Sequence, residues 1–121
     1  MAALTDLTWQ QLAAKLPAGA ITLVPQDESV PAKVIIDVNL VADTNVDALT
    51  DTGVVKFFSM LFTAANRAQI DANVDQIDGE RLTAFSPATI GNSANGFVTL
   101  TRPFVCRSEL STATNIIGTS G

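Results

Sequence analysis

The segment from Thr52 to about Asn73 constrains the fold of this chain more than any other, because it is the longest stretch with helical periodicity. At about 100° per residue its apolar side chains cover roughly half of the helix surface. They are Val54, Phe57, Phe58, Leu61, Ala65, Ala68 and Ala72, flanked by Val55, Phe62 and Ala64. The opposite face carries Lys56, Ser59, Thr63, Asn66 and Arg67. This pattern predicts a helix that packs on a sheet and a second element, with Phe58 and Leu61 nearly inaccessible.

The chain before this helix predicts one short helix and two strands. Thr8 and Gln11 have the spacing of a capping box at the start of a short apolar stripe. Trp9 on this helix is either a core residue or an anchor for a partner, and its size favours the core. Residues 21–24 form a brief β-rich run. Residues 33–41 alternate as a half-buried strand does, with the buried face formed by Val34, Ile36, Val38 and Leu40.

The chain after the long helix predicts a hairpin. Its strands run from Glu80 to about Ile90 and from Phe97 to about Leu110, and the turn-rich residues 91–96 join them. Pro103 cannot donate a ladder hydrogen bond, so we expect a bulge at Arg102–Pro103. The predicted fold is α+β, in the order α-β-β-α-β-β, with one long central helix packed across a mostly antiparallel sheet of about four strands. Residues 1–121 form a single domain, with a tail over 110–121.

The composition favours a chain whose surface is partly covered by other subunits. Hydrophobic residues make up 47% of the chain and charged residues only 16%, which is lean in charge for a soluble monomer. The net charge of −5 argues against nucleic acid or an anionic membrane as a partner. There is no signal peptide pattern, and no apolar run approaches the ~18 residues of a membrane span. These features favour an intracellular or virion origin.

The sequence offers little for catalysis. It contains no histidine, so it lacks the usual proton shuttle and the commonest transition-metal ligand. Cys106 is the only cysteine, and its place after two apolar residues in a predicted strand indicates a core thiol rather than a nucleophile. We therefore expect no enzyme activity and no catalytic, cofactor-binding or metal-binding residues.

A repeated D-x-N-V-D pattern, at residues 43–47 and 71–75, is the most specific motif. Alternating oxygen-bearing residues are how a calcium loop begins. Both copies lack the glycine at the sixth position, and Val54 or Leu82 replaces the bidentate glutamate at the twelfth. We therefore expect no tight calcium binding, and a role for these residues in turns at the two ends of the long helix.

The leading hypothesis is a non-enzymatic structural subunit that self-associates or docks in a larger protein assembly, for example as a virion, tube or shell component. The alternative is a small regulatory or ligand-binding domain with a pocket between helix and sheet. In an assembly, partners would cover apolar residues off the main helix stripe or in the tail, and arginines would face acidic loops. The predicted interface residues are Met60, Ile70, Val74, Ile116, Ile117, Arg102 and Arg107.

Overall fold

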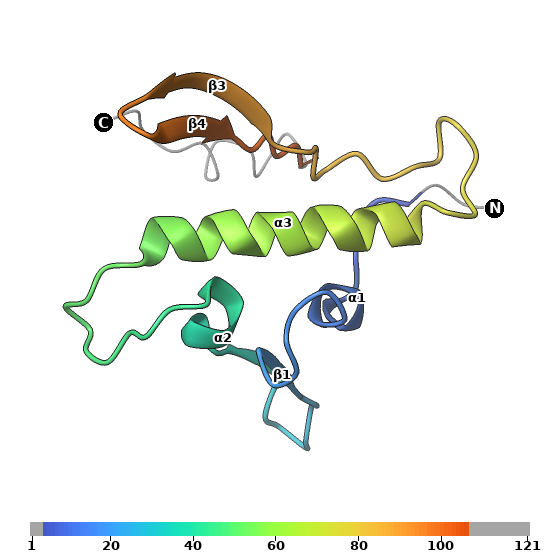
Figure 1. Ribbon diagram of the computed structural model, residues 1–121. Coiled ribbons are helices and arrows are strands. Elements are labelled where there is room, and N and C mark those ends of the chain that lie inside the picture. The colour runs from blue at the N-terminus through green and yellow to red at the C-terminus, as the bar shows by residue number, and fades with distance from the viewer. Residues whose placement is uncertain (1–3, 107–121) are drawn as a thin grey trace, which may run out of the picture.

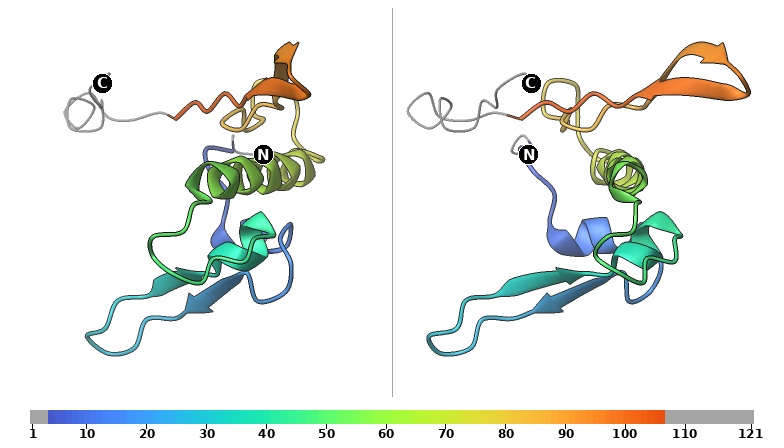
Figure 2. Two further views of the ribbon diagram at one scale, coloured as in Figure 1. Left: turned by 60° about the vertical axis from the view of Figure 1, so that its left-hand side comes forward. Right: turned by 90° about the vertical axis from the view of Figure 1, so that its left-hand side faces the viewer.

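The computed structural model describes residues 4–106, and it is organised around one long helix. This helix lies between the N-terminal elements on one side and a two-stranded ribbon on the other (Figures 1 and 2). The elements are α1 (Trp9–Ala13), β1 (Ile21–Val24), β2 (Lys33–Ile36), α2 (Val38–Ala42), α3 (Val54–Ala72), β3 (Thr89–Ala94) and β4 (Phe97–Thr101). The α+β class predicted from the sequence is confirmed.

The helix α3 confirms the prediction made for residues 52–73. Gly53 precedes its first turn with φ of 143°, a conformation that favours glycine. At the other end, the backbone N–H of Asn73 still donates to the carbonyl of Gln69 at 3.0 Å. An ion pair between Lys15 and Asp71 ties the turn after α1 to the last turn of α3.

The four strands form two separate two-stranded antiparallel sheets, so the prediction of one four-stranded sheet is wrong. One sheet pairs β1 with β2, and the other pairs β3 with β4. The connection between α3 and β3 does not extend either sheet. Several of its backbone groups bind side chains of α3, as described below, and Phe85 forms an isolated bridge with Phe104.

The predicted strand over 33–41 ends at Ile36 and is followed by the helix α2. Asp37 caps this helix, because its Oδ1 accepts a hydrogen bond from the backbone N–H of Leu40 at 3.1 Å. Val38, Val41 and Ala42 also have helical i, i+3, i+4 spacing, and the last two are buried. The alternation that predicted a strand was therefore outweighed by an aspartate cap.

The buried apolar residues of the described chain are mostly small. They are Ala20, Val41, Ala42, Ala64, Ala65, Ala68 and Leu82. Phe58 is 49% exposed and Leu61 is half-buried, so the prediction that both are nearly inaccessible is wrong. No sheet covers this face of α3. The helices α1 and α2 contact it instead, and alanines let such helices approach closely.

The N-terminal helix α1 has the predicted capping box. Thr8 Oγ1 accepts from the N–H of Gln11 at 3.1 Å, and Gln11 Oε1 accepts from the N–H of Thr8 at 2.8 Å. Trp9, which directly follows the cap, is 53% exposed. The prediction of a core position for Trp9 is therefore wrong, because a helix of five residues offers no deep face in which to bury an indole.

The C-terminal hairpin is confirmed, but its strands are shorter than predicted. Asn95 and Gly96 have φ values of 54° and 81°, as a two-residue type I′ turn requires. The bulge lies in β3, between Ile90 and Ser93, and not at Arg102–Pro103, which follow the end of β4. The extra residue sits near Gly91, where a Cβ atom would make an ordinary van der Waals contact with the backbone oxygen of Thr99 at 3.5 Å.

Candidate functional site

One face of α3 carries three side-chain amides that hold another part of the chain by its backbone. We call Asn66, Gln69 and Asn73 the amide ladder, and residues 82–85 the strap. The ladder residues follow one another at i, i+3 and i+7, so they share one face of the helix. The strap belongs to neither two-stranded sheet, although Phe85 forms an isolated antiparallel bridge with Phe104 and the carbonyl of Ala84 accepts from the N–H of Val105 at 2.9 Å. On the side of α3, the ladder supplies the hydrogen bonds that a neighbouring strand would make.

The ladder makes five hydrogen bonds with two strap residues. Asn73 binds Leu82 in both directions, with its Oδ1 accepting from the N–H at 2.8 Å and its Nδ2 donating to the carbonyl at 2.9 Å. Gln69 binds Phe85 in the same way, at 2.8 Å and 2.9 Å. Asn66 adds a second donor to the Phe85 carbonyl at 2.8 Å. Each paired amide thus imitates the backbone of a β-strand.

Aromatic rings extend this contact beyond the ladder. Phe62, on the same face of α3, has its ring centroid 6.1 Å from that of Phe85 and 5.7 Å from that of Phe104. The rings of Phe85 and Phe104 are 5.2 Å apart, distances at which aromatic pairs attract one another. Phe104 is still 50% exposed. The cluster therefore fixes the start and the end of the C-terminal hairpin to α3 without being closed to solvent.

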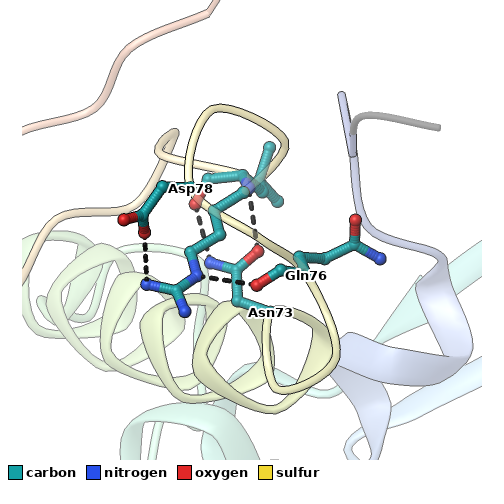
Figure 3. Close-up of polar contacts among 5 residues, drawn as sticks. Asn73, Gln76 and Asp78 are labelled. Carbon is teal, nitrogen blue, oxygen red and sulfur yellow. Dashed lines mark hydrogen bonds and ion pairs between the residues drawn. The ribbon is translucent and has the colours of Figure 1, made fainter. Parts of the chain in front are cut away.

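A loop at the end of α3 leads the chain into the strap (Figure 3). Arg81 donates from Nε to the carbonyl of Gln76 at 3.0 Å, and its guanidinium lies 3.1 Å from Asp78. Asp78 is almost fully exposed, so this ion pair adds little to stability. The backbone contact of Arg81 does more, because it fixes the loop immediately before the first ladder bond.

Covering α3 on two sides leaves a third strip of the helix exposed. Met60, Ile70 and the following Val74 lie there with 38%, 58% and 71% of their surface exposed. These three were predicted as interface residues. Arg102 is half-buried and donates to Ser59 Oγ at 2.8 Å. The other predicted interface residues, Arg107, Ile116 and Ile117, lie outside the described residues.

The first D-x-N-V-D stretch lies at the start of the loop before α3, and the second lies at the C-terminal end of α3. Asn39 and Asp51, which lie outside the motif, organise the loop that contains the first stretch. Asn39 in α2 accepts from the N–H of Val46 at 2.7 Å and donates to its carbonyl at 3.0 Å. Asp51 Oδ2 accepts from the N–H groups of Asp47 and Ala48 at 2.8 Å and 3.1 Å. These two bonds lower the pKa of the Asp51 carboxyl below its ordinary value. Within residues 4–106, no cluster of three or more metal-binding side chains is present.

Two hollows stand out among residues 4–106, and no residue of α3 lines either of them. The first, of about 500 Å³, lies between the strap, residues 104–106 and residues 4–6. Cys106 lines it and is exposed, so the prediction of a core thiol is wrong. The second, of about 560 Å³, lies between Trp9 and the β1–β2 hairpin. A pocket between the long helix and a sheet, as the alternative hypothesis requires, is not among them.

Comparison with protein families, with characterised proteins and with solved structures finds no match for this chain. No helix between residues 4 and 106 combines the length and the hydrophobicity needed to cross a membrane. A function for this protein therefore has to be argued from its surfaces and contacts.

Proposed function

We propose that this chain is a non-enzymatic structural subunit that self-associates. One observation carries the proposal: the small apolar residues are buried and the large apolar residues are exposed. Five of the seven buried apolar residues in the described chain are alanines, and none of its large side chains is fully buried. Twenty large apolar side chains are exposed in the same part of the chain. Single exposed apolar residues are ordinary, but a whole population of them marks surfaces that meet other proteins.

The exposed strip of α3 is the part of this surface that supports the proposal best. Ile70 lies in the last turn of α3 and Val74 lies two residues after its end, and both side chains are mostly exposed. The α3 helix gains nothing from presenting these apolar side chains to water. A second subunit that covers them would remove this apolar surface from solvent.

Sedimentation velocity of the wild type and of Ile70→Asp tests this proposal. We expect the wild type to form oligomers and Ile70→Asp to shift it toward monomer, because the new carboxylate would lose its hydration in the contact. Leu49→Asp is the matched control, since Leu49 is fully exposed in a loop away from the strip. A wild type that stays monomeric up to high concentration would refute the proposal. Equal effects of the two substitutions would refute the role of the strip.

A further inference from the structure

The β3–β4 ribbon is exposed along its whole length. Every residue of both strands is exposed, including Ile90, Phe97, Val98 and Leu100. Figure 2 shows the ribbon projecting from the rest of the molecule. A two-stranded ribbon alone is marginally stable in water, and such ribbons normally gain stability from a third strand or a packed face. This ribbon has neither within the described residues.

The two edges of the ribbon differ in their capacity to accept another strand. The bulge between Ile90 and Ser93 distorts the edge of β3, as bulges do on protected edges. The edge of β4 is regular. No charged residue occurs anywhere from 86 to 101, although charges are the usual protection of an exposed edge. Within residues 4–106, the edge of β4 is therefore unpaired and carries no charge.

The turn geometry identifies which backbone groups of β4 are free. In a two-residue type I′ hairpin the residues that flank the turn exchange hydrogen bonds, and here they are Ala94 and Phe97. By the same alternation, the backbone N–H and C=O groups of Thr99 and Thr101 point toward β3. Val98 and Leu100 consequently direct their N–H and C=O groups away from β3. Their apolar side chains share one face of the ribbon with that of Ile90, which is opposite Leu100.

We propose that β4 pairs antiparallel with β4 of a second copy of this chain, about a twofold axis at Thr99, which joins the two ribbons into one four-stranded sheet. Val98 of one copy then exchanges hydrogen bonds with Leu100 of the other, which satisfies all four free groups on each edge. The proposal rests on the self-association proposed above and specifies one of its contacts.

A second copy as the occupant agrees with the self-association proposed above, with charge and with side-chain pairing. No like charges meet in the pairing, because β4 is uncharged and Arg102 is turned back to Ser59. Val98 and Leu100 of both copies meet on one face, with Ile90 of each copy beside them.

A disulfide test reads the register of this pairing directly. Residues directly opposite in a non-hydrogen-bonded antiparallel pair have Cα atoms about 4.5 Å apart, which suits a disulfide. In a Cys106→Ser background, Thr99→Cys should form a covalent dimer under mild oxidation. Phe97→Cys is the control, because the two copies of residue 97 would be roughly 13 Å apart. We expect the Thr99→Cys dimer to form at least about tenfold faster.

A proline pair tests the backbone contact without relying on cysteine. Leu100→Pro removes an outward N–H that is free within the ribbon, so the hairpin itself tolerates it. Leu100→Ala removes the same side chain but keeps the N–H. We expect Leu100→Pro to raise the dimer dissociation constant at least about tenfold over Leu100→Ala, with circular dichroism showing that both remain folded.

The outcomes separate this inference from the proposed function. If the wild type is monomeric at every concentration, both are overturned. If the wild type associates but Thr99→Cys cross-links no faster than Phe97→Cys, only the β4 pairing is overturned. In that case the effect of Ile70→Asp shows whether the α3 strip makes the contact instead.

Discussion

The substitution Gln69→Leu tests whether the amide ladder holds the strap. Gln69 is 8% exposed, and it both donates to and accepts from the backbone of Phe85. Leucine is similar in size but makes neither bond. The Phe85 carbonyl keeps its bond from Asn66, whereas its N–H loses the only partner that the ladder gives it.

The expected loss of stability follows from these two bonds. A neutral hydrogen bond contributes about 1 kcal/mol, and an unpaired buried donor costs about 1 to 3 kcal/mol. Phe85 is half-buried, so water relieves part of this cost, and we expect a loss of about 2 kcal/mol. Such a loss would lower the Tm by on the order of 10 °C.

Urea unfolding followed by circular dichroism measures this loss. The matched control is Gln10→Leu, which makes the same chemical change at an exposed position of α1 and should stay within about 0.5 kcal/mol of the wild type. All variants are compared at one protein concentration, since self-association adds to apparent stability. If Gln69→Leu unfolds at the same urea concentration as Gln10→Leu, the ladder contributes no stability and the reasoning fails.

Two further predictions concern the loop before α3 and the repeated motif. The pKa of Asp51 in the folded protein should lie below 3.8 in an NMR titration, so its bonds stabilise the loop above that pH and are lost as the pH falls through the folded pKa. An unshifted Asp51, or equal acid sensitivity in Asp51→Asn, would contradict this. Calorimetric titration with calcium should show no micromolar or tighter binding, because both motifs lack the bidentate glutamate.

The sequence predicted the elements whose signals are local. The periodicity of residues 52–73 was enough for α3, and the Thr8–Gln11 spacing was enough for the capping box. The turn-rich residues 91–96 between two predicted strands likewise indicated the C-terminal hairpin. These signals act within a few residues, so no knowledge of the tertiary structure is needed to interpret them.

The sequence prediction failed where one segment determines the state of another. Asn66 was assigned to the solvent face of α3 because it is polar, yet it binds the backbone of the strap. The available signal was the spacing of three uncharged amide residues at positions 66, 69 and 73. They share one helix face, and the solvent face of a helix normally carries charged residues as well. The sequence predicted a strand for the strap, because the segment is extended. Only the positions of its bonding partners show that side chains of α3 hold most of it and that a single bridge joins Phe85 to Phe104.

The ladder also alters where substitutions can accumulate in this part of the chain. It binds the main chain of Leu82 and Phe85, which every residue except proline offers equally. Thr83 and Ala84 lie between them and bind none of the ladder amides. The amides of α3 therefore fix the main chain of the strap, while the side chains of Leu82 and Phe85 add a buried contact and an aromatic contact. Substitutions at residues 83 and 84 would leave the path of the chain intact. The loss of a single ladder amide from α3 would alter it.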